Sequence, residues 1–201
     1  MKVAVFVSGR GTNLQAILSS RQDNKKLDVS AVFSDKLDCP AFDIARRYSI
    51  PTFSLGNKEG CIIYRELSEL LSNLKIEFIV LAGFLKLIPN DVVANFDKRI
   101  INIHPALLPS FGGKGMFGIN VHKAVYESSV KVTGVTVHFV DSSYDTGKII
   151  AQRCVDISDA VSPEDIAERV LKIEHQILPY VVNKFAENKI RIINDRVVVL
   201  D

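Results

Sequence analysis

Cysteine is scarce in this chain, with three residues among 201. Cys39, Cys61 and Cys154 are widely spaced, odd in number and not arranged as ligand pairs. The sequence therefore predicts neither a disulfide framework nor a zinc site. A reduced, cytoplasmic setting fits this use of cysteine.

An excess of one charge sign is also missing, since 25 Lys and Arg are balanced by 23 Asp and Glu. Nucleic acid is therefore a poor first guess for a partner. The longest apolar run, residues 78–88, is interrupted by Lys86 and is shorter than the ~20 residues that cross a bilayer. The N-terminal apolar run is too short for a signal peptide. We expect a soluble protein that uses no membrane.

Apolar residues make up 47% of the chain, which is enough for a packed core. Against a soft expectation of roughly 150 residues per domain, 201 residues predict one good-sized domain rather than two small ones. We find no internal repeat, low-complexity tract or linker. The sequence therefore predicts a single domain over residues 1–201.

The first half alternates β-branched runs with segments of helical period. Strands are expected at 3–7, 29–33, 52–55, 78–82 and 100–104, and helices at 13–20, 41–48 and 64–74. Several strands are apolar on both faces, as a sheet covered by helices on both sides requires. This order predicts an α/β fold with a doubly wound, mostly parallel, Rossmann-like sheet.

The second half has a different pattern, because residues 131–140 alternate apolar and polar side chains and 148–155 form a second such run. These runs predict late antiparallel strands joined by a wide loop. A C-terminal helix is expected from Ser162, which would cap it, and Pro163 suits its first position. Pro179 should kink this helix or end its first section. Segments 190–193 and 197–199 predict a terminal β-ribbon.

A glycine-rich turn at residues 8–14, SGRGTNL, lies where the first strand meets the first helix. Glycines let the backbone approach a ligand, and N–H groups at a helix start favour an anion, so the turn predicts a phosphate site. The alternative is a tight turn in which Thr12 or Asn13 only caps the helix. A dinucleotide site, suggested by Asp35 after the second strand, fails because Leu14 replaces the third glycine. A single phosphate is therefore preferred.

Asn102 and His104 share one face at the carboxyl end of the fifth strand, where open α/β sheets bind their ligands. An amide beside an imidazole would hold a carbonyl and stabilise the oxyanion that forms when a nucleophile adds to it. The alternative is a buried pair satisfied by backbone groups. The residue types alone leave both interpretations open.

Asp145 belongs to the loop between the two late strands, two residues before a glycine. A carboxylate from a distant part of the chain would raise the pKa of His104 and keep it charged, or pass a proton through water. A plain turn is the alternative. His138 is expected to pack in or near the site rather than to react, and His122 and His175 receive no catalytic role.

The segment 109–118 contains four glycines within residues 112–118. Such backbone freedom predicts either a mobile segment that closes over substrate or a passive surface loop.

Taken in order and spacing, these segments resemble the phosphoribosylglycinamide formyltransferase family of folate-dependent enzymes. Residues 8–14 are similar to its opening loop, LAGFLKL at 81–87 to its pterin-side segment, and NIHPALLP at 102–109 to its catalytic signature. The segments GVTVHFVD at 134–141 and YDTG at 144–147 are similar to the second half of its site. The resemblance covers nearly the whole chain.

The resemblance implies transfer of the formyl group of 10-formyltetrahydrofolate to the primary amine of glycinamide ribonucleotide, without a metal, in purine biosynthesis. The neutral amine would attack the formyl carbon, while Asn102 and protonated His104 stabilise the oxyanion and Asp145 raises the pKa of His104 and helps to move the amine proton. Implied binding residues are Gly11, Thr12 and Asn13 for the phosphate, Glu174 for the sugar, and Leu85, Lys86, Leu87, Ile88, Asn102, Val140 and Asp141 for the pterin.

Other members with the same residue set are alternatives: methionyl-tRNA formyltransferase, sugar-amine formyltransferases and formyltetrahydrofolate hydrolase. Length argues against the first and the last, which have an additional domain. A nonenzymatic nucleotide-binding module of the same fold is an alternative of another class. The expected partners are small molecules, and the expected assembly is a monomer or homodimer. The loop at 110–118 is longer than a short turn found in some members, so no ribonucleotide contact is assigned there.

Overall fold

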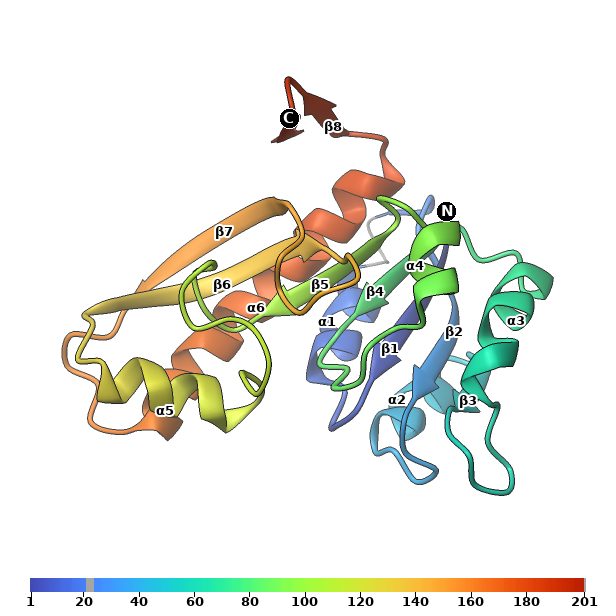
Figure 1. The fold of residues 1–201 in the computed structure, drawn as a ribbon, viewed down its shortest axis with the longest axis horizontal. Helices are drawn as coiled ribbons and strands as arrows, with labels where there is room; N and C mark the ends of the chain where they lie inside the picture. Colours follow the sequence, from blue (N-terminus) through green and yellow to red (C-terminus); the bar gives the residue numbers. More distant parts are fainter. Residues whose placement is uncertain (21–23, 201) are drawn as a thin grey trace. The chain divides into compact units, whose positions relative to one another are not determined.

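The computed structural model describes residues 1–20 and 24–200 (Figure 1). It divides into two compact units, Met1–Asn102 and Ile103–Asp201, and each is described by itself below. The prediction of a single domain stays a prediction. None of the helices within the described residues combines the length and apolar character that a membrane span needs.

The first unit is built on parallel strands in the order β3-β2-β1-β4-β5. All residues of β1 from Val3 to Val7 and all four of β4 are buried, because helices cover both faces of a parallel sheet. Phe6 of β1 stacks on Phe33 of β2 with ring centroids 4.7 Å apart, and Phe84 meets Phe6 edge to face. The strands are β1 (Lys2–Val7), β2 (Asp28–Ser34), β3 (Thr52–Ser54), β4 (Phe78–Leu81) and β5 (Ile100–His104).

The helices of this unit are the crossover connections between those strands. They are α1 (Thr12–Ser20), α2 (Ala41–Arg47), α3 (Leu67–Asn73) and α4 (Asn90–Asn95), and a 3₁₀ turn η2 (Tyr64–Glu66) precedes α3. The single helix expected at 64–74 is therefore a 3₁₀ turn followed by a short α-helix. The sequence patterns did not predict α4.

The second unit pairs β6 (Val132–Phe139) with β7 (Ile149–Asp156) in antiparallel fashion. The long helix α6 (Pro163–Ala186) packs on both strands and on α5 (Ile119–Glu127) (Figure 1). A terminal ribbon follows, formed by β8 (Ile190–Ile193) and β9 (Arg196–Val199). The predicted hairpin, helix and ribbon are confirmed, whereas α5 was not predicted.

The start of α6 agrees with its sequence signature, since the Ser162 side chain accepts a hydrogen bond from Asp165 N at 3.1 Å. Of the two outcomes expected at Pro179, an end to the first section of this helix is wrong, because α6 runs on to Ala186, and a kink stays a prediction. Pro179 is buried, and burial of the surrounding apolar face offsets the one backbone hydrogen bond that a proline removes.

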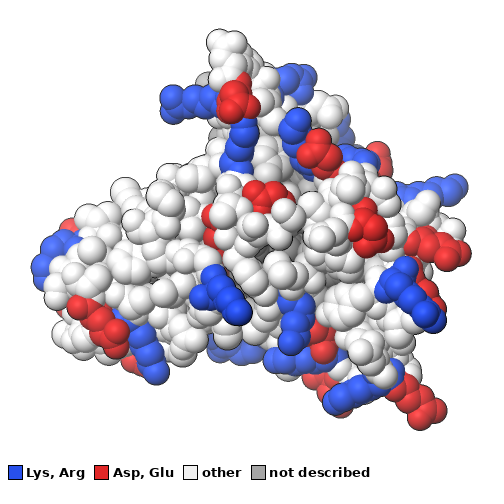
Figure 2. Space-filling model, in the orientation of Figure 1, with Lys and Arg blue, Asp and Glu red and all other residues white. Residues whose placement is uncertain are grey.

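The predicted fold class is confirmed: a doubly wound, mostly parallel α/β architecture with late antiparallel strands and a C-terminal helix. On the face drawn in Figure 2, cationic and anionic side chains are interspersed, and neither sign forms a continuous patch.

Candidate active site

The glycine-rich turn lies between β1 and α1, as predicted. Gly11 has a φ of +74°, and a Cβ there would lie 2.6 Å from the Cβ of Ala41, so only glycine fits. Gln15 N donates to Gly11 O at 2.9 Å and closes the first turn of α1. The first N–H groups of a helix have no carbonyl partner within it, which suits an anion at Thr12 and Asn13.

Ser8 joins this turn to the predicted pterin-side segment of the same unit. Its backbone N–H donates to Gly83 O at 3.0 Å, and its hydroxyl accepts from Leu85 N at 3.0 Å. Leu85 and Leu87 are more than two-fifths exposed, whereas Ile88 is buried. The segment after β4 therefore presents apolar surface beside fixed backbone groups, as recognition of a flat heterocycle requires.

Asn102 and His104 are two residues apart on β5, so their side chains point to the same face of the strand. Ile101 and Ile103, the two neighbours of Asn102 on the strand, are both buried. Asn102 is half-buried, and the His104 side chain is 3% exposed. The alternation places an amide and a shielded imidazole on the same face of the strand at its end.

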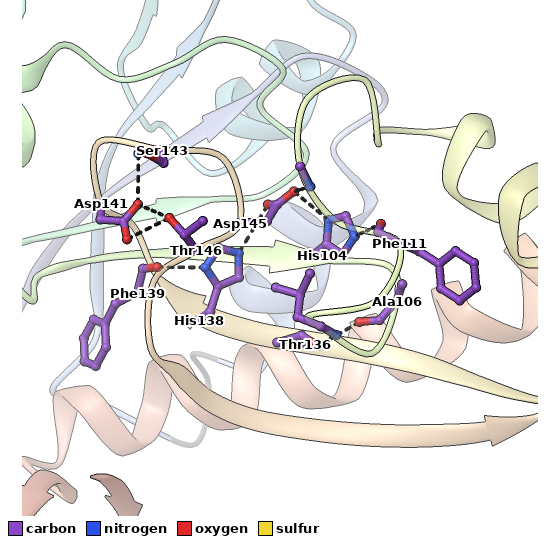
Figure 3. A network of polar contacts seen from close by, with 12 residues as sticks. His104, Ala106, Phe111, Thr136, His138, Phe139, Asp141, Ser143, Asp145 and Thr146 are labelled. Atoms are coloured by element: carbon purple, nitrogen blue, oxygen red, sulfur yellow. Dashed lines mark hydrogen bonds and ion pairs between the residues drawn. The ribbon is translucent and has the colours of Figure 1, made fainter. Parts of the chain in front are cut away.

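Asp145 lies between two histidine rings (Figure 3). Its Oδ2 is 3.6 Å from His104 Nδ1, and its Oδ1 is 3.5 Å from His138 Nε2. The three side chains come from β5, from β6 and from the loop between β6 and β7, and none is more than 10% exposed. The structure thus brings His104 and Asp145 together, as predicted, and adds His138 to them.

The glycine-rich loop after β5 contacts both partners through its backbone. His104 Nε2 lies 2.8 Å from the Phe111 carbonyl oxygen, and Gly113 N donates to Asp145 Oδ2 at 2.9 Å. A Cβ at Gly112 would lie 2.5 Å from Leu108 Cδ2 and 3.3 Å from Asp145 Cβ. Glycine at this position therefore lets the loop approach the carboxylate. The prediction that the loop moves stays a prediction.

Thr136 holds the turn that follows His104. Its hydroxyl donates to Ala106 O at 2.7 Å and accepts from Leu108 N at 3.0 Å and from Gln152 Nε2 at 2.9 Å. Gln152 Nε2 also lies 2.9 Å from Leu108 O. One hydroxyl therefore ties this turn to both antiparallel strands.

The pKa of His104 differs in direction from the expectation. Burial disfavours the imidazolium and lowers the pKa below its usual value, whereas Asp145 and the Phe111 carbonyl act to raise it. Asp145 therefore acts in the predicted sense, but desolvation is larger and the net shift is downward. Sequence reasoning missed this result because it had no information on how deeply the ring is buried.

The pKa of Asp145 is below its usual range. Burial alone would raise it. The hydrogen bond from His138, which requires a proton on Nε2, the hydrogen bond from Gly113 N, and the positive charge available on His104 and His138 together outweigh burial. The carboxylate is therefore held ionised next to two bases.

His122 on α5 is a further buried histidine in the second unit. Burial first, and then the charge of His104, lower its pKa to about 4. Its Nδ1 has no hydrogen-bond partner among the described residues. The ring is therefore neutral at physiological pH.

The remaining predicted binding residues lie in the second unit. Val140 and Asp141 are half-buried at the end of β6, and the Asp141 carboxylate accepts from Ser143 N at 2.9 Å and from the Thr146 hydroxyl at 2.7 Å. These bonds close the loop that carries Asp145. Glu174 is half-buried in the middle of α6. Within the described residues, no set of three or more His, Cys, Asp or Glu side chains is arranged to hold a metal ion.

Two contributors to this site were missed by the sequence interpretation. The first is the contact of His138 with Asp145, since His138 was expected only to pack in or near the site. The second is the Phe111 carbonyl, a backbone group for which residue type gives no signal.

The family model described as formyl transferase matches residues 1–182. The chain belongs to the formyl transferase family.

Within that family, the chain is similar to chloroplastic phosphoribosylglycinamide formyltransferases of plants. The protein of Arabidopsis thaliana is 44% identical over 195 residues, which cover 94% of this chain and 67% of the relative. The protein of Vigna unguiculata is 40% identical over 193 residues, covering 94% and 62%. The chain thus spans about two thirds of the length of these relatives.

A solved structure gives the same result for the fold. The crystal structure of phosphoribosylglycinamide formyltransferase from Anaplasma phagocytophilum matches with a TM-score of 0.89 at 33% sequence identity. The match covers 100% of this chain and 93% of that one.

Proposed function

We propose that this chain transfers the formyl group of 10-formyltetrahydrofolate to the primary amine of glycinamide ribonucleotide, a step of purine biosynthesis. The observation that carries the proposal is the contact of His104 with Asp145 in a chain similar over nearly its full length to phosphoribosylglycinamide formyltransferases. The donor folate is a cosubstrate, and the chemistry needs no metal. A cytoplasmic location and a monomer or homodimer remain part of the proposal.

Binding of the ribonucleotide rests on the glycine turn of the first unit. Its phosphate would accept hydrogen bonds from the backbone at Gly11, Thr12 and Asn13, where the helix start favours negative charge. Glu174 would accept from hydroxyls of the sugar. For the donor, Leu85, Lys86, Leu87 and Ile88, with Asn102, Val140 and Asp141, would surround the pterin.

The bond-forming step begins when the neutral amine attacks the formyl carbon. The carbonyl oxygen gains negative charge, which the Asn102 amide would stabilise by donating a hydrogen bond and the protonated His104 ring by its positive charge. Burial lowers the pKa of His104, and a developing oxyanion beside the ring would favour its protonated form.

The proton released by the attacking amine must leave before the tetrahedral intermediate collapses. Asp145 is ionised, only 10% exposed and in contact with His104, so it would accept this proton and help to pass it on. Collapse breaks the bond from carbon to N10 of the folate, which gains a proton, and forms the formamide. Holding both reactants in line supplies much of the remaining acceleration.

The decisive measurement is acceptor specificity. The purified chain is incubated with 10-formyl-5,8-dideazafolate, with and without glycinamide ribonucleotide, and release of the deformylated folate is followed. We expect release only with the acceptor present. Release without the acceptor would indicate a hydrolase, and absence of release under both conditions would indicate a binding module; either result contradicts the proposal.

A further inference from the structure

The two histidines beside Asp145 each have one ring nitrogen held by a backbone carbonyl. His104 Nε2 lies 2.8 Å from Phe111 O, and His138 Nδ1 lies 2.7 Å from Phe139 O. A carbonyl oxygen only accepts hydrogen bonds, so each of these nitrogens must carry a hydrogen. In the neutral ring, the opposite nitrogen then carries a lone pair and no hydrogen, so it is an acceptor.

Both lone-pair nitrogens face the same carboxylate. His104 Nδ1 is 3.6 Å from one Asp145 oxygen, and His138 Nε2 is 3.5 Å from the other. With both rings neutral, Asp145 faces two acceptors and the cluster carries one negative charge. A proton on either ring turns one contact into an ion pair and makes the cluster neutral.

A second proton is much less favourable than the first. It would leave a net positive charge among side chains that are at most 10% exposed, where water screens charge poorly. The effect of His138 on His104 agrees with this reasoning, because the charge of His138 opposes protonation of His104. The rings therefore compete for one proton.

We propose that His138 is a positioning residue of the formyl transfer, which shares a single proton with His104 through Asp145 and thereby sets the protonation state of His104. This inference rests on the proposed function for its role in turnover. The proton that Asp145 accepts from the amine has two neighbouring bases to receive it, and one of them, His138, does not need to touch the substrate.

The surrounding elements carry other titratable groups. His122 on α5 is near enough for the charge of His104 to act on it, and it is neutral, because its pKa is lowered to about 4. The helix α6 packs on β6 and carries His175, the remaining histidine of the chain. Asp141 in the loop before Asp145 bonds to Ser143 and Thr146 within that loop. The proton shared beside Asp145 therefore belongs to His104 and His138.

The first test measures the tautomers directly in the full chain. Long-range ¹H–¹⁵N correlation spectra of the four histidines report which ring nitrogen carries hydrogen and how each ring titrates. We expect the Nε2–H tautomer for His104 and the Nδ1–H tautomer for His138 at high pH. The opposite tautomer for His138 would overturn the proposal, and this readout does not depend on any activity.

The second test replaces His138 in two ways. His138→Asn keeps an amide near the Phe139 carbonyl but presents nothing to Asp145, whereas His138→Gln can present an amide donor to Asp145. We expect the titration midpoint of His104 to move to higher pH in both variants, since both remove the competing base. We expect kcat to fall at least about 10-fold in His138→Asn, less than for a direct proton-transfer group, with KM little changed and with partial recovery in His138→Gln.

The outcomes separate this proposal from the proposed function. An unmoved His104 midpoint in a folded variant, or equal kcat in both variants, overturns the role of His138 even when formylation of glycinamide ribonucleotide is intact. Shifted His104 midpoints in a chain that formylates no ribonucleotide would support the shared proton and contradict the proposed function alone. If His138→Asn fails to fold, the tautomers of the unmodified chain and the midpoint in His138→Gln still decide the question.

Discussion

The glycine turn at Gly11 and the cluster around Asp145 are polar sites of opposite construction. The turn uses backbone groups from one stretch of chain between β1 and α1. The cluster uses side chains from three separated segments, all shielded from water. A backbone site has no titratable group of its own, whereas the cluster depends on where one proton resides. Substitutions at the turn should therefore act through steric fit, and substitutions or pH changes at the cluster should act through charge.

The largest effect is expected at the cluster. Replacing His104 by Ala or Asp145 by Asn should lower kcat at least about 100-fold, because each removes a group that stabilises the transition state by charge or proton transfer. Steady-state kinetics with the ribonucleotide and the formyl donor measure this loss. Circular dichroism confirms that each variant is folded.

The matched control is Asp97→Asn, which makes the same chemical change at a carboxylate that is 76% exposed. Turnover in that variant should equal that of the unmodified chain. Near-normal turnover in His104→Ala or Asp145→Asn would refute their assignment.

Charge dependence should also be visible in stability at acid pH. Because the pKa of His122 in the folded chain is lowered to about 4, the folded state resists its protonation. The associated stability is fully present above the usual pKa near 6.5 and is lost as pH falls toward 4. The loss should approach about 3 kcal/mol from this residue alone.

Urea unfolding at pH 7.5 and at pH 4.5, in the unmodified chain and in His122→Gln, isolates this contribution. The variant should lose less stability between the two pH values, because it has no buried ring to protonate. An equal loss in both proteins would show that other groups dominate the acid response.

Shape dependence should appear at the turn. Gly11→Ala adds a Cβ 2.6 Å from that of Ala41 at a φ of +74°, so we expect a loss of about 1–3 kcal/mol in unfolding free energy. The KM for the ribonucleotide should rise more than kcat falls, and the change in KM should not vary between pH 6.5 and pH 8.

Gly9→Ala provides the stability control from the same turn, since a Cβ there meets nothing within 4 Å. Its unfolding free energy should stay within about 0.5 kcal/mol of the original. Equal destabilisation by both substitutions would contradict the steric explanation for Gly11.

The smallest effect is expected at the start of α6, where a side chain rather than a ligand accepts a hydrogen bond from a free backbone N–H. Ser162 caps α6 through Asp165 N, so Ser162→Ala should cost about 1 kcal/mol of stability and leave KM for the ribonucleotide unchanged. Urea unfolding and steady-state kinetics measure the two quantities. A raised KM would mean that this helix start also contributes to binding.

The sequence was sufficient where the determining interactions are local. The five strands of the first unit, the glycine turn and the shared face of Asn102 and His104 all follow from short-range patterns. The cap at Ser162 was equally visible. Of the two outcomes predicted at Pro179, an end to the first section of the helix is wrong, because packing of α6 on β6, β7 and α5 outweighs a local breaker.

The rest depends on contacts between distant segments. That Asp145 meets two histidines follows from the pairing of β6 with β7 and from the path of the loop, which residue types do not specify. The pKa of His104 is lowered because its ring is buried, and the sequence does not show that burial. The Phe111 carbonyl is a main-chain group, which every residue in the loop carries.

The Thr136 hydroxyl has a practical consequence for protein engineering. It bonds to the turn after His104 and to Gln152 of β7, so the conformation of that turn depends on side chains of both antiparallel strands. Grafting residues 102–109 alone onto a new scaffold would transfer the amino-acid sequence of the turn without the contacts that fix its conformation. The smallest portable unit includes the antiparallel hairpin, and recombination between homologues should place its crossover points outside it.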